Sequence, residues 1–431
     1  MSSDAIQIQA LDSRHIWHPF SQAETGPAFP VAVKAQGAYI ETADRHRVMD
    51  LVSSWWVNLH GHGEPKIAAA IAKQAAELEQ VIFADFTHAP AARLAAGLAE
   101  ALPGDLSKVF YSDDGSTAVE VALKMALQYF PLVGQPKRKR LLGFEQGYHG
   151  DTVGAMSVGH SSGYFRAWSG MLFPVDMLPF PATWENDEAV EAKETRALAA
   201  LDAKLSDDVA AVILEPLVQG AGGMRMCRPE FLRKVANHVR EAGALLILDE
   251  VMTGFGRTGT LFACEQAGVV PDLICLSKGL TGGFLPMGAT VAREGFCQAF
   301  IGQTLDRAFL HGHSYHANPL GCAAGLASLE ILTSPDCQRR RAALEVVQRE
   351  RISALAKRHP EMHARSCGTI AAFNLAKGSY GDGAGDKIKA HLWDKGFLIR
   401  PLGPVVYFLP PFCVTTEEMH NAWDVLESQL G

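Results

Sequence analysis

Nearly continuous runs of Val, Ile, Leu and Ala recur along the middle of the chain, and a polar loop follows each run. The runs lie at 108–112, 139–144, 209–216, 244–250, 272–278 and 287–292. Strands that are buried on both faces have this continuous apolar pattern. Helical patterns lie between several of them, at 65–80, 116–130 and 229–241. The chain therefore predicts an α/β fold, with a mainly parallel sheet and helices on both of its faces.

The pattern changes towards both ends of the chain. Residues 38–51 alternate like a β-hairpin with a polar turn, and 319–358 is helical and rich in Ala, Leu and Arg. After about residue 330 the chain returns to a compact α/β texture. We predict a large domain over 61–329 and a smaller one over 330–431. The N-terminal segment 1–60 is expected to pack with the smaller domain.

Composition narrows the class of protein. Of 431 residues, 48% are hydrophobic and 20% charged, with a net charge of −8, which excludes wholesale disorder. The one basic cluster, 137–140, is expected to be a solvated loop, and nucleic acid is not an expected partner. The chain has no run of about 18 apolar residues, and its start lacks the pattern of a signal peptide. We therefore expect a cytoplasmic protein.

Three candidate motifs do not lead to a site. The eight cysteines form no C-x-x-C pair, so neither a disulfide framework nor a zinc ribbon is expected, and most should be buried. Three histidines at 311, 313 and 316 have no neighbouring acid or cysteine, and we expect no metal. The G-x-G-x-x-G at 254–259 is separated from its strand, and no helix pattern follows, which disfavours a dinucleotide site.

Polar residues end several predicted strands, where ligands bind in open parallel sheets. Glu215, Asp249 and Lys278 end three of them. A desolvated lysine can form a Schiff base, and a carboxylate can pair with a protonated ring nitrogen. Gly115-Ser116 opens a helix, whose N–H groups suit a phosphate, and the ring of Tyr148 could stack on a flat ligand. Together these residues predict a pyridoxal phosphate site.

Four segments carry a family resemblance. They are GYHGDT (147–152), LEPLVQGAGGM (214–224), LILDEVMTGFGRTG (246–259) and PDLICLSKGLTGG (271–283). With them the chain resembles the class III aminotransferases of pyridoxal phosphate fold type I. RHIWHPF (14–20), SSWW (53–56) and IRPLGPVVYFLPP (399–411) resemble the biotin-pathway branch, the adenosylmethionine–8-amino-7-oxononanoate aminotransferases.

The resemblance implies a role for each cofactor residue. Lys278 would bond the cofactor and move the proton, Asp249 would hold its ring nitrogen protonated, and Tyr148 would cover the ring. Gly115 and Ser116 would bind the phosphate, and Glu215 would support the surroundings. The resemblance also implies a homodimer in which Ser314 reaches the phosphate across the interface.

On the substrate side, the resemblance implies that Arg400 binds the carboxylate of the keto acid. The remaining expected substrate contacts are Phe20, Trp55, Trp56, Arg257, Gly312 and Tyr407. Two adjacent tryptophans cannot both face inward on one strand, so at least one should line a cavity or an interface. The roles of His149, Asp151 and His313 stay open.

The expected activity is ping-pong transfer of an amino group from S-adenosylmethionine to 8-amino-7-oxononanoate. Lysine is an alternative donor, because Phe20 stands where adenosylmethionine users commonly carry tyrosine, and HGHSY (311–315) is closer to lysine users. Other class III enzymes, acting on ornithine, 4-aminobutyrate or amines, are a second alternative. A ligand-binding protein without catalytic activity is a third.

Overall fold

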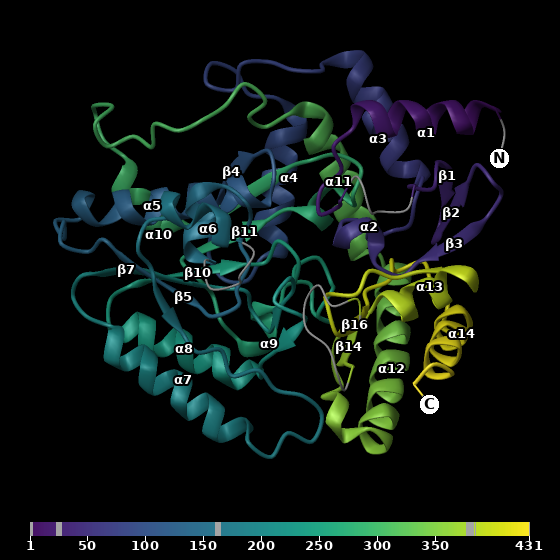
Figure 1. The fold of residues 1–431 in the computed structure, drawn as a ribbon. Helices are drawn as coiled ribbons and strands as arrows, with labels where there is room; N and C mark the ends of the chain where they lie inside the picture. The colour runs from purple at the N-terminus through teal and green to yellow at the C-terminus, as the bar shows by residue number, and fades with distance from the viewer. Residues whose placement is uncertain (1–2, 23–27, 160–164, 376–382, 384, 431) are drawn as a thin grey trace.

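A seven-stranded sheet forms the centre of the molecule (Figure 1). The computed structural model describes residues 3–22, 28–159, 165–375, 383 and 385–430. In spatial order the strands are β4 (Leu106–Ser112), β12 (Gly288–Arg293), β11 (Leu273–Leu276), β10 (Leu245–Asp249), β7 (Val209–Leu214), β5 (Arg140–Phe144) and β6 (Asp176–Leu178). From β11 to β6 all neighbours are parallel, whereas β12 runs antiparallel to both β4 and β11. The predicted mainly parallel α/β sheet is confirmed.

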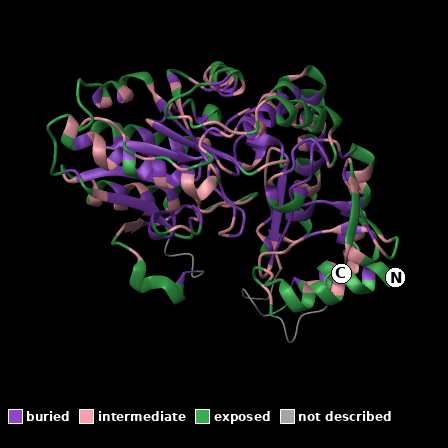
Figure 2. Ribbon diagram, turned by 90° about the horizontal axis from the view of Figure 1, so that it is seen from above, coloured by how far each residue is buried: buried purple, intermediate pink, exposed green. Residues whose placement is uncertain are grey.

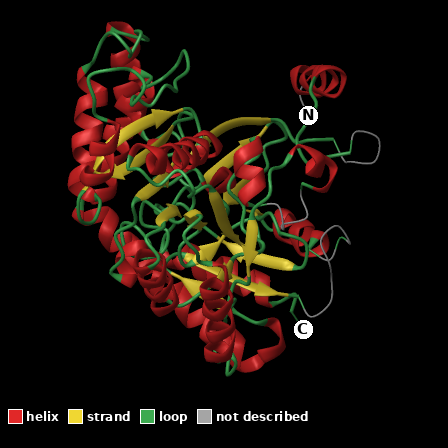
Figure 3. Ribbon diagram, turned by 90° about the vertical axis from the view of Figure 1, so that its left-hand side faces the viewer, coloured by secondary structure: helices red, strands yellow, loops and turns green. Residues whose placement is uncertain are grey.

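Helices cover both faces of this sheet, as Figure 3 shows. On β10, Leu245 and Ile247 join the core beneath α5 (Gly115–Leu132), while Leu246 and Leu248 join the core beneath α4 (Ala89–Ala101) and α8 (Pro229–Glu241). Successive side chains of a strand point to opposite faces. Both faces are therefore buried (Figure 2), which explains the continuous apolar runs.

Local signals in the sequence set where the helices begin and end. Asp114 and Thr117 form a capping box at the start of α5. The expected helical stretch 319–358 is two helices, α11 (Pro319–Thr333) and α12 (Pro335–Arg358). The break falls at Ser334, because Pro335 suits the first position of a new helix and Ser334 accepts a hydrogen bond from the backbone N–H of Cys337.

A second α/β layer is built from both ends of the chain. The strands β1 (Ala32–Gln36), β2 (Tyr39–Thr42) and β3 (Arg47–Asp50) are antiparallel neighbours, so the hairpin predicted over 38–51 is confirmed. Strand β15 (Phe397–Leu398) pairs in parallel with β3. A further sheet contains β13 (Arg365–Cys367), β14 (Ile370–Asn374) and β16 (Val405–Phe408), and α12 and α14 (Thr416–Glu427) pack beside it.

One hydrophobic core joins these distant segments, with Met49 and Leu51 packed in the same cluster as Phe397 and Trp423. On the basis of this packing, we propose a division of the chain into the segment 1–60, a large domain over 61–329 and a smaller domain over 330–431.

Residues 1–2, 23–27, 160–164, 376–382, 384 and 431 lie outside the described residues. The other helices and strands are α1 (Ser3–His15), α2 (Ser53–Trp56), α3 (Pro65–Glu77), α6 (Val153–Val158), α7 (Val190–Lys204), β8 (Val218–Gln219), β9 (Arg225–Met226), α9 (Cys264–Ala267), α10 (Glu294–Cys297) and α13 (Asp386–Asp394).

The basic cluster 137–140 is a solvated loop only in part, because Lys137 and Lys139 are exposed whereas Arg138 and Arg140 bond to neighbouring elements. Arg138 is buried and donates to the backbone oxygens of Val209 and Ala242, each at 2.8 Å. Arg140 begins β5 and pairs with Asp176 at 2.8 Å. Both arginines therefore fasten the ends of neighbouring elements. All eight cysteines are free, and five of them are buried, which confirms the expectation that most of the cysteines are buried. Within the described ranges, no helix has the length and apolarity needed to span a membrane.

A buried glutamine links three elements of the smaller layer, and its loss tests that packing. Gln348 accepts from Trp423 Nε1 at 2.8 Å and donates to the backbone oxygen of Thr369 at 3.1 Å. We expect Gln348→Leu to lower the free energy of unfolding by about 2 kcal/mol, since it leaves two buried polar groups unpaired. Urea denaturation followed by tryptophan fluorescence measures it. Arg349→Ala, at the exposed neighbouring position, should change the free energy of unfolding very little. Equal stability of the two variants would contradict the structural role given to the hydrogen bonds of Gln348.

Candidate active site

The carboxyl ends of β7, β10 and β11 meet the loop after β5 and the start of α5 at one cavity of about 420 Å³. Ligands bind at this edge of open parallel sheets. The cavity brings together seven of the predicted cofactor residues or their neighbours: Gly115, Ser116, Tyr148, His149, Glu215, Asp249 and Lys278. They come from five segments that are far apart in the sequence, and folding brings these segments together.

Lys278 follows β11 by two residues and starts a short 3-10 helix, rather than ending the strand as expected. Its backbone is left-handed, with φ 45°. Its Nζ lies 5.1 Å from the centre of the Trp56 ring. Burial lowers the pKa of Lys278, although the charges of Asp249 and Glu215 oppose the shift. The fold therefore favours a neutral amine, which is the nucleophilic form of lysine.

Asp249 ends β10 and is held by two donors. Its Oδ2 lies 2.7 Å from Nδ1 of His149, and its Oδ1 accepts from the backbone N–H of Val251 at 3.0 Å. Both side chains of the pair are almost completely buried. Burial opposes protonation of His149, but the hydrogen bond to Asp249 and the charges of Asp249 and Glu215 raise its pKa above the usual value. The pair keeps a carboxylate oriented inside the protein.

Glu215 follows β7 and shapes the backbone around the cavity. It accepts from the backbone N–H of Tyr148 at 3.0 Å and from that of Gly220 at 2.9 Å. Burial raises the pKa of Glu215 to about 7, with His149 opposing the shift and Asp249 adding to it. Its role is therefore to tie two loops together, one of which carries Tyr148.

The start of α5 provides a cradle for an anion. The first N–H groups of a helix have no partner within it, and they carry the positive end of the helix dipole. Ser116 Oγ accepts from the backbone N–H of Asp151 at 3.2 Å. Gly150 has φ 124°, and a Cβ there would lie 2.1 Å from Ser116 Oγ. A glycine is needed for the loop to approach the helix start this closely.

A larger chamber of about 1210 Å³ adjoins this cavity and shares Trp56, Tyr148 and Lys278 with it. Its walls are mainly apolar and include six aromatic side chains, and its charged residues are Asp151, Asp386, Lys389 and Arg400 beside Lys278. The guanidinium of Arg400 lies 4.6 Å from the centre of the Trp55 ring. Phe20 packs edge-on against the same ring at 5.6 Å. The chamber can thus hold an apolar chain that ends in a carboxylate.

The tryptophan pair sits on a tight helical turn, α2, and not on a strand. Every residue from Ser53 to Trp56 has a positive φ, between 51° and 119°. Asp50 holds this turn by accepting from the backbone N–H groups of Val52 and Ser54. Both tryptophans line the chamber, which confirms that at least one lines a cavity. Trp56 is buried, and its Nε1 donates to the hydroxyl of Tyr407, which stands behind it, at 3.0 Å.

Four predicted residues lie outside both cavities: Tyr407, which stands behind Trp56, and Arg257, Gly312 and Ser314. Arg257 is fully buried and donates to the backbone oxygens of Pro410 at 2.7 Å and Asn58 at 2.9 Å. Gly312 and Ser314 lie in an exposed loop of the single chain. The substrate role of Arg257 and Gly312, and the phosphate role of Ser314, stay predictions. In the described part of the chain no group of three His, Cys, Asp or Glu side chains could hold a metal ion.

Sequence reasoning missed part of the chamber wall. Phe165, Trp168, Met171 and Lys389 line it and come from outside the family-like segments. Two large aromatic side chains in the short segment FRAWSG (165–170) are a signal for a cavity wall or an interface. Lys389 has no such signal, because its helix α13 has the pattern of an ordinary amphipathic helix.

Comparison with known proteins places the chain in a family. The family model for class-III aminotransferases matches residues 20–430. The adenosylmethionine-8-amino-7-oxononanoate aminotransferase of Synechococcus elongatus is 52% identical over 420 residues, 96% of this chain and 98% of the relative. The protein of that name from Geobacter sulfurreducens is 36% identical, over 99% of this chain and 98% of the relative.

Solved structures agree with the sequence relatives. The crystal structure of an adenosylmethionine-8-amino-7-oxononanoate aminotransferase from Methanocaldococcus jannaschii has a TM-score of 0.92 at 32% identity, over 99% of this chain and 98% of that one. A PLP-bound amine transaminase from an uncultivated Pseudomonas species has a TM-score of 0.90 at 31% identity, over 97% of this chain and 99% of that one. With the family model matching nearly its whole length, the chain belongs to the class III aminotransferases.

Proposed function

We propose that this protein is a pyridoxal-phosphate-dependent aminotransferase that converts 8-amino-7-oxononanoate to 7,8-diaminononanoate in biotin biosynthesis, with S-adenosylmethionine as amino donor. The names of the relatives from Synechococcus elongatus and Geobacter sulfurreducens support the substrate pair. One observation carries the proposal. The cavity that contains Lys278 and Asp249 adjoins a chamber that is lined by aromatic side chains and contains Arg400.

The residues of the smaller cavity fit pyridoxal phosphate. The start of α5, with Gly115 and Ser116, provides N–H groups and a hydroxyl for the phosphate. Asp249 provides a buried carboxylate for the pyridine nitrogen, and Tyr148 lines the same space. When bound, the cofactor supplies an aldehyde and an electron-withdrawing ring. The glycine at position 150 supports this fit, because any Cβ there would intrude on the cradle beside Ser116.

Lys278 holds the cofactor and acts as the acid and base of the reaction. Its lowered pKa leaves the amine free to take a proton from the reacting carbon of the donor and to return a proton to the acceptor. Asp249 keeps the ring nitrogen protonated, and His149 fixes the orientation of Asp249 through the 2.7 Å contact. His149 also lines the cavity, and because its Nδ1 contacts Asp249, its contribution is to position that carboxylate.

The chamber selects the substrates. Arg400 binds the carboxylate of the nine-carbon keto acid, while Phe20, Trp55 and Trp56 enclose its alkyl chain. Aromatic faces also suit the sulfonium and the adenine of S-adenosylmethionine. Tyr407 supports the wall through its hydrogen bond with Trp56. The volume of about 1210 Å³ gives room for a donor larger than lysine.

The functional form is a homodimer in the cytoplasm. Large apolar side chains are exposed on the single chain around the loop of Gly312 and Ser314, and these are Ile82, Phe86, Leu305, Leu310 and Tyr315. Exposed apolar groups of this kind mark an interaction surface. Gln80 donates to the backbone oxygen of Ser314 at 2.7 Å, which links the two parts of this surface. Ser314 and Gly312 then serve the site of the partner subunit.

The direct test of the proposed function is an assay with both candidate donors. Purified holoenzyme should form 7,8-diaminononanoate from 8-amino-7-oxononanoate and S-adenosylmethionine, measured by mass spectrometry. Lysine in place of S-adenosylmethionine should give little product. Product from lysine alone would overturn the donor, and transfer to simple ketones without transfer to the keto acid would overturn the biotin-pathway substrate.

Arg400 tests carboxylate recognition separately from the chemistry. We expect Arg400→Met to raise the KM for 8-amino-7-oxononanoate roughly 30-fold or more, because it removes the partner of a largely enclosed carboxylate. The KM for the matching amino ketone without a carboxylate should stay unchanged. Lys389→Met removes a charge from the same chamber and serves as the matched control. Equal losses for both acceptors would mean that Arg400 supports the fold or the cofactor instead.

A further inference from the structure

Two arginine side chains line one cavity at the joint between the central sheet and the smaller layer. It is separate from the cavity around Lys278 and Asp249, called the cofactor cavity below, and from the larger chamber that contains Arg400, called the substrate chamber. Arg225 lies in β9 and Arg365 begins β13. Together they line a cavity of about 220 Å³. His363, Asn374, Val405 and the glycines at 222 and 223 also line it, and none of its lining residues belongs to the cofactor cavity or the substrate chamber.

Arg365 is buried, with 6% of its surface exposed, and it contacts neutral acceptors. Its guanidinium donates to the backbone oxygens of Gly223, Met224 and His363, at 2.6, 2.6 and 2.8 Å. A fourth bond reaches Asn374 Oδ1 at 3.0 Å. These four bonds fix the plane of the guanidinium and use four of its five N–H groups, which leaves one N–H of Nη2 for a ligand. They bring no negative charge to the buried cation.

Arg225 is half-buried and has the same kind of partners. It donates to the backbone oxygens of Glu145 at 3.1 Å and Phe180 at 3.3 Å, and to Gln219 Oε1 at 3.3 Å. Within the described residues, neither Arg225 nor Arg365 forms an ion pair with a carboxylate. The carboxylates of Glu145 and Glu215 attract Arg225 over longer distances. Burial, and then the charge of Arg225, lower the pKa of Arg365 to about 10.

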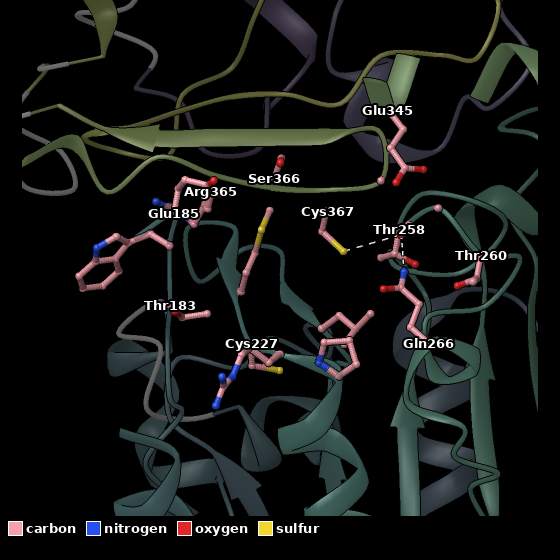
Figure 4. A pocket seen from close by; sticks show the side chains of 17 residues that line it. Thr183, Glu185, Cys227, Thr258, Thr260, Gln266, Glu345, Arg365, Ser366 and Cys367 are labelled. Carbon is pink, nitrogen blue, oxygen red and sulfur yellow. Dashed lines mark hydrogen bonds between the residues drawn. The ribbon is translucent and has the colours of Figure 1, made fainter. Parts of the chain in front are cut away.

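Two desolvated cations without an anionic partner are costly, and an anion between them removes much of that cost. The cavity has room for one small oxyanion and a few waters, at about 30 Å³ for each water. A neighbouring cavity of about 530 Å³ shares Thr183, Trp184 and Arg365. Figure 4 shows the carboxylates of Glu185 and Glu345 around that larger space, which therefore suits an anion less well.

We propose that Arg225 and Arg365 form a binding site for a small oxyanion of the phosphate or sulfate type, at the joint between the two layers. The site is distinct from the phosphate cradle at the start of α5. It lies behind the substrate chamber, because Gly223 packs against Val405, and Val405 pairs with Leu402 of the chamber wall. A bound oxyanion fastens β9 to β13 at this joint.

Calorimetry on the holoenzyme tests the site, with its bound cofactor occupying the α5 cradle. Inorganic phosphate is titrated into protein carrying Arg400→Met, which removes binding in the substrate chamber. We expect saturable binding that weakens at least 10-fold when Arg225→Gln is added. Arg233→Gln removes the same charge from the exposed face of α8 and should leave binding unchanged. Equal phosphate affinity in the Arg225 and Arg233 variants would overturn the proposal.

A crystal of the wild-type holoenzyme grown with selenate locates the ion without any variant. The expected result is an anomalous peak between Arg225 and Arg365, and the absence of a peak there would overturn the site even if Arg225→Gln fails to fold. Ribose 5-phosphate distinguishes the sources of the oxyanion. Displacement of selenate by inorganic phosphate, but not by ribose 5-phosphate, supports a free ion. Displacement by both supports the phosphate group of a larger metabolite at the same site.

Discussion

The buried contact between Asp249 and His149 is the interaction on which the active site depends. A carboxylate at the carboxyl end of a central strand loses its hydration, and the 2.7 Å contact with His149 together with the backbone N–H of Val251 replaces part of it. The same burial lowers the pKa of Lys278, which follows the neighbouring strand. One desolvated environment therefore provides both an oriented anion and a nucleophilic amine, which is what pyridoxal phosphate chemistry requires.

The second layer of the molecule completes the site through a few specific contacts. Asp50 holds the left-handed turn that carries Trp55 and Trp56. The hydroxyl of Tyr407 on β16 accepts from Trp56, and Arg400 faces Trp55 from the same C-terminal region. The substrate chamber therefore lies where the two ends of the chain pack together. Pairing of β15 with β3 fixes this arrangement, because it ties residues 49–50 to 397–398.

Much of the fold was predictable because buried strands have a simple signature, and the residues at their ends follow from topology. Asp249 and Lys278 could be placed together on that ground. Trp168 could not, because its place in the chamber wall depends on tertiary packing of a short irregular segment. Sequence patterns do not show that a single polar side chain is buried, and Arg257 lies behind the cavities, bonded to two backbone oxygens. The partner-dependent role of Ser314 is not encoded in any local pattern.

The most direct test of this account is to find which lysine carries the cofactor. The holoenzyme is reduced with borohydride, digested and analysed by tandem mass spectrometry. The account predicts that the mass of the reduced pyridoxyl phosphate is found on the peptide that contains Lys278, with the other lysines unmodified. Attachment to a different lysine, or no attachment in protein that retains the cofactor, would contradict the assignment of Lys278.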